Sequence, residues 1–217
     1  MNNRSYAHFP CFYYFCCMDD RYKTVAGPAE GYITEKKSRF IAHIYPVRSA
    51  EEVKEIVDEH RKKYYDARHV CWAYMLGWKR EDYRLNDDGE PSGTAGKPIL
   101  GQINSAGLTD VLILVVRYFG GTLLGTGGLI KAYREAAADA IAHAQIMEKT
   151  VNDTIDIRFN YTLLNEVMRV LKQFETVQWT QDFGESCNMR LQIRRSQSPK
   201  LKAMLSSVHG VEISCKL

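Results

Sequence analysis

The chain has 217 residues, of which 45% are hydrophobic and 25% charged, with 15 glycines and 6 prolines. This composition is typical of a folded globular protein and excludes collagen-like, low-complexity and disordered chains. A formal net charge of only +3 argues against extended DNA binding, because proteins that neutralise many phosphates carry a larger basic excess. The longest apolar run, Val111–Val116, is too short to cross a bilayer.

The six cysteines lack the Cys-x2-Cys spacing of a zinc site, so we expect free thiols and a cytoplasmic protein. Three of them lie within residues 1–17, in an aromatic stretch that lacks the aliphatic core and cleavage site of a secretory signal. We interpret residues 1–17 as a non-native or disordered extension and Met18 as the natural start.

In the first part of the chain, apolar residues between 31 and 47 predict one or two strands around a polar interruption at 36–39. Ser49 and Glu52 form a capping-box pattern, and a helix is predicted to follow as far as about Lys63. The segment His69–Leu76 is rich in residues that suit a strand.

Turn-forming residues dominate between 80 and 107, and such long structureless loops are often functional. A short helix is predicted from about Pro98, at its first position, to Ala106. Residues 110–119 are apolar without alternation, which predicts a strand buried on both faces at the centre of a sheet. A long amphipathic helix is predicted after the glycine-rich stretch 120–128, ending near Ala144.

From about residue 150 the predicted order of elements is β-α-β-β-α-β, with Ser198 capping the second helix and Pro199 at its first position. This is the order of a ferredoxin-like split βαβ unit, a fold that carries many functions and identifies none.

The glycine run could bind an anion such as phosphate through its backbone amides and the helix N-terminus. Its glycines are Gly120, Gly121, Gly125, Gly127 and Gly128. Positive side chains around the run are Arg117, Lys131 and Arg134. The spacing matches neither a P-loop nor a dinucleotide fingerprint, so a tight strand-to-helix turn explains the glycines equally well.

The loop at 87–97 carries a second group of polar residues: Asp87, Asp88, Glu90, Ser92, Thr94 and Lys97. Its three carboxylates could hold a hard metal ion, but a solvated turn is the favoured interpretation because the calcium-loop pattern is absent. Ser92 or Thr94 would need a nearby base such as His69 to act as a nucleophile.

Three further features have a purely structural interpretation as well as a functional one. His69 is favoured as a structural or partner-facing residue, and Cys71, within an apolar strand, is expected to pack in the core. Trp179, with Arg194 and Arg195, could contact RNA if all three faced solvent, although burial of the indole is equally consistent with the sequence.

Four long motifs, at 37–42, 67–74, 86–98 and 117–129, together resemble the IMPACT/YigZ family in its bacterial two-domain branch. The resemblance covers roughly residues 19–145, and the remainder looks like the C-terminal domain of the bacterial members. It implies an α+β N-terminal domain at 18–147, similar to a domain of a small-subunit ribosomal protein. The domain at 150–217 would be ferredoxin-like, similar to those of elongation factor G.

Eukaryotic members of the family are translational regulators that compete for the activator protein of a starvation-sensing kinase. The resemblance therefore favours a non-catalytic regulator without cofactor or metal, which binds the ribosome, RNA or a translation-associated protein. The contacts would be at His69, Arg117, Gly120, Gly121, Lys131, Arg134 and the 87–97 loop. The alternative is an enzyme or sensor that binds a phosphorylated small molecule at the glycine run. The two hypotheses separate on whether the acidic loop and the glycine run meet in one concave site.

Overall fold

The computed structural model describes residues 20–174, 178–183 and 186–214, which form two compact units. The first unit spans Arg21–Val151, and the second contains Asp20 and the described residues from Asn152 onward. The extension predicted at residues 1–17 lies outside the described residues. Within the described chain, no helix is long and apolar enough to cross a membrane.

The first unit is built on an antiparallel five-stranded sheet in the order β2-β3-β6-β4-β5. Its strands are β2 (Ala29–Glu35), β3 (Ser38–Pro46), β4 (His69–Leu76), β5 (Asp82–Asn86) and β6 (Val111–Tyr118). A separate antiparallel ribbon, which the sequence did not predict, pairs β1 (Arg21–Val25) with β7 (Ile146–Thr150). Residues 146–150 therefore belong to the first unit.

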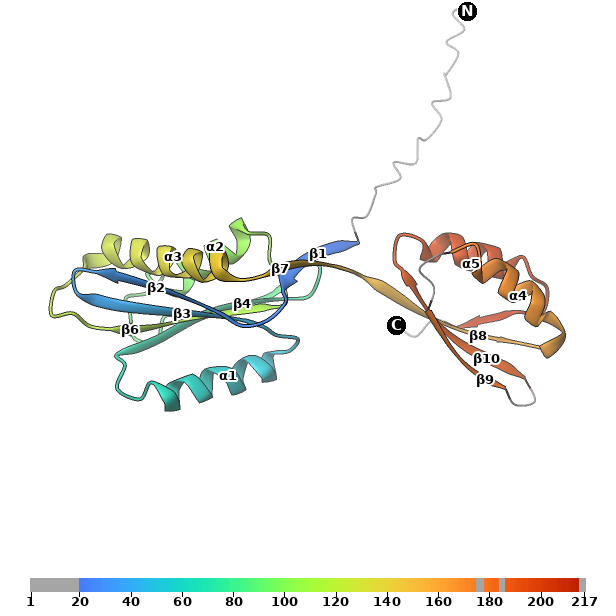
Figure 1. Cartoon of the computed structure of the whole chain (residues 1–217), viewed down its shortest axis with the longest axis horizontal. Helices are drawn as coiled ribbons and strands as arrows, with labels where there is room; N and C mark the ends of the chain where they lie inside the picture. The colour runs from blue at the N-terminus through green and yellow to red at the C-terminus, as the bar shows by residue number, and fades with distance from the viewer. Residues whose placement is uncertain (1–19, 175–177, 184–185, 215–217) are drawn as a thin grey trace, which may run out of the picture. The chain divides into compact units, whose positions relative to one another are not determined.

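Helices cover both faces of the five-stranded sheet. Figure 1 shows α1 (Ala50–Lys63) on one face and both α2 (Gly96–Ser105) and α3 (Gly125–His143) on the other. In β6, Ile113 and Val115 pack in the core beneath α2 and α3, while Leu112 and Leu114 pack in the core beneath α1. The prediction of a central strand buried on both faces is confirmed.

The strands predicted around the polar interruption at 36–39 and the first helix are also confirmed, and the second strand begins inside that interruption, at Ser38. Lys36 and Lys37 have φ values of 44° and 65° in the two-residue turn between β2 and β3, as expected for the tight turns that match strand twist. Ser49 Oγ accepts a hydrogen bond from the Glu52 N–H at 3.3 Å. In a capping box the Glu52 carboxylate would accept from the N–H of the cap residue, Ser49. Here it accepts from the N–H of Arg48, one residue before the cap.

The segment predicted as a structureless loop contains a strand. β5 pairs with β4 at the edge of the sheet, and all five of its residues are exposed. An exposed edge strand needs no buried side chains, so it has no apolar alternation to read. The helix that follows begins at Gly96 and places Pro98 third, not first. Proline is tolerated there because the first-turn N–H groups have no partner within the helix.

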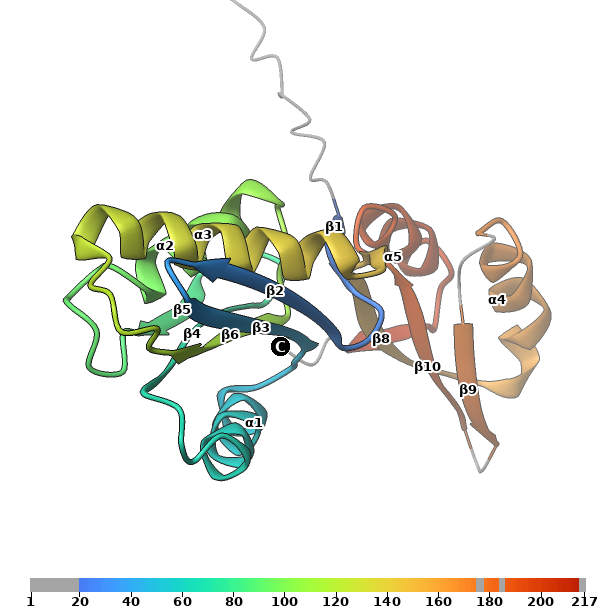
Figure 2. The ribbon, with the colours of Figure 1, turned by 60° about the vertical axis from the view of Figure 1, so that its left-hand side comes forward.

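The second unit has ferredoxin-like topology, because its antiparallel sheet runs in the order β11-β8-β10-β9. Its strands are β8 (Asn152–Phe159), β9 (Gln178–Phe183), β10 (Cys187–Arg194) and β11 (Glu212–Ser214). Its helices are the 3-10 turn η1 (Tyr161–Leu163), α4 (Leu164–Leu171) and α5 (Ser198–Ser206). In Figure 2, α4 and α5 lie on the same side of the sheet. The predicted Ser198 cap is wrong: Gln197 is the cap residue, and Ser198 lies buried inside the first turn.

Two histidines are buried between α1 and the sheet. The ring centroids of His43 and His60 are 4.9 Å apart, and their Nε2 atoms lie 3.1 Å from the hydroxyls of Tyr64 and Tyr45, respectively. Glu30 Oε1 lies 3.1 Å from His43 Nδ1. Burial lowers the pKa of His43 to about 4, an effect that nearby His60 reinforces and the Glu30 carboxylate opposes.

This lowered pKa predicts acid-sensitive stability. The folded protein holds a proton on His43 less readily than the unfolded chain, whose histidine pKa is about 6.5. The free energy of unfolding should therefore fall as the pH is lowered from about 6.5 towards 4. Urea titrations across this range should show a weaker pH dependence for His43→Gln than for the parent. His143→Gln, which changes an exposed histidine of the same unit, should keep the parent's slope. Equal slopes in all three proteins would contradict the assignment.

Candidate functional site

A pocket of about 510 Å³ opens where β4 begins, β6 ends and α3 begins. We call it the β4–β6–α3 pocket. The sheet register places His69 directly opposite Arg117, and Glu90 closes over both from the 87–97 loop. The remaining lining residues are Arg68, Pro91, Phe119, Leu123, Leu124, Gly125, Thr126 and Leu129. The acidic loop and the glycine run thus meet in one concave site, through Glu90 and Gly125.

A buried ion pair forms one wall of this pocket. Arg117 Nη1 donates to Glu90 Oε1, and the two side chains are only 7% and 3% exposed. The Tyr133 hydroxyl donates to the same carboxylate oxygen at 2.8 Å. Because a charge buried without a partner is strongly destabilising, the loop that carries Glu90 is tied to the end of β6.

Cys71 lies behind this wall, with its Sγ 3.3 Å from the Tyr133 hydroxyl and 3.0 Å from the Asp87 carbonyl oxygen. Burial raises the pKa of the Cys71 thiol far above its ordinary value, so the thiolate that a nucleophile requires is not formed near neutral pH. The prediction that Cys71 packs in the core is confirmed, since the residue is fully buried.

His69 is oriented by the backbone of the loop. Its Nδ1 lies 2.7 Å from the carbonyl oxygen of Asp88, which can only accept, so Nδ1 donates and Nε2 is the acceptor nitrogen of the neutral ring. Nε2 lies 3.9 Å from Glu90 Oε1, and 14% of the side chain is exposed. In the described chain His69 makes no hydrogen bond to Ser92 or Thr94, whose suggested base it was.

The Asp87 carboxylate holds the loop itself together, and that of Asp88 ties the loop to β4 and α1. Asp87 Oδ1 accepts from the N–H groups of Ala95 and Gly96, and its Oδ2 accepts from that of Gly93. The Asp88 carboxylate accepts from the N–H of Val70 and from a guanidinium on α1. Among the described residues, no cluster of three or more histidine, cysteine or acidic side chains could hold a metal ion.

The glycines of the run divide into three groups. A Cβ on Gly120 would lie 2.1 Å from the carbonyl carbon of Lys37, so this glycine permits close approach to the β2–β3 turn. Gly121 and Gly125 have φ values of 86° and 69°, in the region that favours glycine. Gly127 and Gly128 lie in the first turn of α3, where Leu124 provides no side-chain cap. Only Gly125 lines the pocket.

Two of the three positive residues predicted for the same site, Lys131 and Arg134, lie elsewhere, whereas Arg117 lines the pocket. Arg134 lines a different hollow together with Lys97, between α2 and α3. Lys131 is exposed and lies 3.8 Å from Glu135, one turn further along α3. The candidate residues therefore divide between two surfaces of the first unit.

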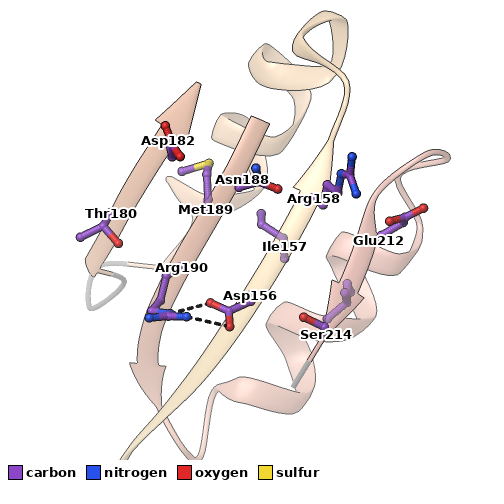
Figure 3. Close-up of a pocket in the computed structure, with 11 residues that line it drawn as sticks. Asp156, Ile157, Arg158, Thr180, Asp182, Asn188, Met189, Arg190, Glu212 and Ser214 are labelled. Atoms are coloured by element: carbon purple, nitrogen blue, oxygen red, sulfur yellow. Dashed lines mark hydrogen bonds and ion pairs between the residues drawn. The ribbon is translucent and has the colours of Figure 1, made fainter. Parts of the chain in front are cut away.

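The sheet of the second unit has an open, polar face (Figure 3). Asp156 and Arg190 pair there through two hydrogen bonds, and Asp182 and Glu212 line the same hollow. Trp179 projects from the other face, because it lies opposite the buried Leu191 in the register, although its indole is 40% exposed. No aromatic side chain lines the described open face.

Arg194 is held by Asp20 within the second unit. Its guanidinium donates to both carboxylate oxygens, at 2.7 and 3.3 Å, and the Ser196 N–H donates to the same carboxylate. The Arg194 guanidinium is the main cause that holds the pKa of Asp20 well below its usual range. Trp179 and Arg194 therefore do not share one RNA-facing surface, and Arg195 lies just past the end of β10.

The sequence reasoning missed the apolar rim of the pocket. Leu123 is 83% exposed and Phe119 is 49% exposed, while Leu124 is partly buried beside them. The sequence did contain a signal for this rim, namely large apolar residues within a glycine-rich segment. Glycines have no side chains that could cover such residues.

Comparison with known proteins assigns the family. The chain is 37% identical over 152 residues to the IMPACT family member YvyE of Bacillus subtilis (strain 168), covering 70% of each protein. The chain belongs to the IMPACT family. The family's Impact N-terminal domain profile matches residues 36–141.

Two further relatives cover more of the chain. The IMPACT family member YigZ of Escherichia coli (strain K12) is 34% identical over 173 residues, which are 79% of this chain and 85% of that protein. A solved structure titled "Crystal structure of an hypothetical protein" is 30% identical, with a TM-score of 0.68. It covers 91% of this chain, and 98% of that structure is matched. The IMPACT resemblance that the motifs indicated is therefore confirmed.

The three backbone hydrogen bonds to Asp87 predict a specific change in hydrogen exchange. In Asp87→Asn the side-chain amide cannot accept from all three N–H groups, and a lost hydrogen bond to a charged group costs roughly 1.5–3 kcal/mol. Exchange at the Gly93, Ala95 or Gly96 amide, followed by NMR, should accelerate about tenfold or more. Asp58→Asn, an exposed change on α1, should leave these amides unaffected. Unchanged protection in Asp87→Asn would show that the carboxylate does not hold the loop.

Proposed function

We propose that this IMPACT family protein is a non-catalytic regulator that binds a translation-associated protein through the β4–β6–α3 pocket. The main support for this proposal is an exposed apolar rim, formed by Phe119 and Leu123, which borders a buried polar cluster. Large apolar side chains at a pocket edge are typical of sites that bury a protein segment. The link to translation rests on the family resemblance.

The polar wall indicates which groups a bound segment would meet. His69 Nε2 offers an acceptor to an N–H or O–H group of the segment. At the opposite side, Gly125 and Thr126 begin a helix of 19 residues whose cap residue makes no side-chain hydrogen bond. The first N–H groups of such a helix favour acceptors and anions. The segment would thus combine an apolar side chain with both donor and acceptor groups.

The chemistry of the wall supports binding more than catalysis. The Cys71 thiol is buried with a raised pKa. The Thr94 hydroxyl donates to the Pro91 carbonyl oxygen at 2.6 Å, within its own loop. Neither group is therefore placed as an activated nucleophile.

The second candidate is a sensor or enzyme for a phosphorylated small molecule. Its support is that the acidic loop and the glycine run meet in one pocket through Glu90 and Gly125, with the uncapped N-terminus of α3 in the same pocket as Arg117. The nearby Glu90 carboxylate weakens this candidate, because it already neutralises Arg117 and would repel a phosphate.

Affinity capture of the tagged chain from its own cell extract tests the proposal, using a Leu123→Asp variant. A charge at this position should reduce recovery of ribosomal proteins or translation factors at least tenfold, because the apolar contact would have to desolvate a carboxylate. The matched control is Tyr65→Asp, which places the same charge at a position where the side chain is 86% exposed, two residues after the end of α1.

Loss of these proteins with Leu123→Asp but not with Tyr65→Asp would support the proposal. Equal recovery by both variants and the parent would contradict it. Retention of a phosphorylated small molecule by the parent in native mass spectrometry, with no translation protein recovered, would favour the second candidate.

A further inference from the structure

The hollow between α2 and α3 is a second surface, which shares no lining residue with the pocket proposed for a protein partner. Both helices lie on the same face of the five-stranded sheet (Figure 1). Its volume is about 530 Å³, and we call it the α2–α3 groove. Its lining residues are Gly93, Lys97, Pro98, Gly101, Gln102, Ser105, Ile130 and Arg134.

The charge of the groove is entirely positive. Lys97 and Arg134 are both exposed, and no carboxylate lies among the residues that line the groove. Within the part of the chain that the structure describes, neither side chain forms an ion pair with an acidic group. The β4–β6–α3 pocket differs in this respect, because Glu90 neutralises Arg117 there.

The position of Lys97 is not explained by the stability of its helix. Lys97 is the second residue of α2, where a positive charge opposes the helix dipole, and the first turn contains no acidic residue. The side chain also does not fill the core, since it is exposed. A cation at this position therefore fits a role towards a ligand better than a role in folding.

Gly101 keeps the floor of the groove open. A Cβ built on this residue would meet no atom within 4 Å, so packing does not require glycine there. Glycine inside a helix costs about 1 kcal/mol relative to alanine. Because Ser105 Oγ donates to the Gly101 carbonyl oxygen at 2.9 Å, what the absent side chain provides is space beside Gln102, whose polar side chain can hydrogen-bond to a ligand.

We propose that the α2–α3 groove binds the phosphate backbone of RNA. Two cations without counter-charges match a short run of phosphates, and the space at Gly101 with the neutral Gln102 side chain beside it suits a ribose-phosphate chain. The small number of cations also agrees with a net charge of only +3, because the contact is local. Recognition of this kind is independent of base sequence.

Fluorescence anisotropy of the full chain with a fluorescein-labelled RNA stem-loop of mixed sequence, at 25–200 mM salt, tests this inference. The Lys97→Ala/Arg134→Ala variant should weaken binding at least tenfold at 50 mM salt. Its plot of log affinity against log salt should be shallower by about 1.5, as expected for two lost phosphate contacts. Gly101→Glu should weaken binding similarly by adding a negative charge where the structure leaves room.

The matched control is Lys54→Ala/Lys62→Ala, which removes two exposed cations from α1, on the opposite face of the sheet. It changes the net charge by the same amount and should bind RNA as the parent does. The inference is overturned if the parent does not bind RNA, if the control loses as much affinity as the groove variants, or if Gly101→Glu binds like the parent. Thermal melts of all the variants separate loss of binding from loss of folding.

Discussion

The buried ion pair between Glu90 and Arg117 is the interaction on which the candidate site depends. Arg117 continues the apolar core strand β6, and its side chain points to the face covered by α2 and α3. A guanidinium in that position needs a carboxylate, because desolvation of an unpaired charge costs several kcal/mol. Glu90 is supplied by the 87–97 loop, which hydrogen bonds from His69 and Val70 to Asp88 also hold against β4.

The same loop forms part of both proposed surfaces. Glu90 and Pro91 line the β4–β6–α3 pocket, whereas Gly93 and Lys97 line the α2–α3 groove. Asp87 ties the two halves of the loop together through three backbone N–H groups. A change that loosens the loop would therefore alter both surfaces, which is why each proposal is tested by a substitution at a surface residue outside the ion pair.

The sequence predicted those features that depend on local patterns. The non-alternating apolar run of β6 required burial on both faces, and helices do cover both. The order of elements after residue 150 predicted a ferredoxin-like unit, and the strand order confirms it. The exposed strand β5 was missed because its stability comes from backbone pairing and leaves no apolar pattern.

The site itself could be predicted only in part. Glu90 is 27 residues from Arg117 and 43 from Tyr133, so no local motif could show that the three side chains meet. Sequence reasoning weighed Asp87, Asp88 and Glu90 as metal ligands and favoured a solvated turn. In the structure the carboxylates of Asp87 and Asp88 accept hydrogen bonds from backbone N–H groups, and that of Glu90 is buried against Arg117. Sequence reasoning also placed Arg134 beside the glycine run. Arg134 is the tenth residue of α3, however, and its side chain lines the α2–α3 groove.

A double-mutant cycle on Glu90 and Arg117 tests the central claim most directly, with the free energy of unfolding measured by urea titration at pH 7. Glu90→Gln alone should destabilise the protein by roughly 3–5 kcal/mol, because it leaves the buried guanidinium without a counter-charge. Glu90→Gln/Arg117→Met should be less destabilised than the sum of the two single variants, with a coupling above about 1 kcal/mol. Additivity of the two substitutions to within about 0.5 kcal/mol would contradict the account, because the two side chains would then not depend on each other.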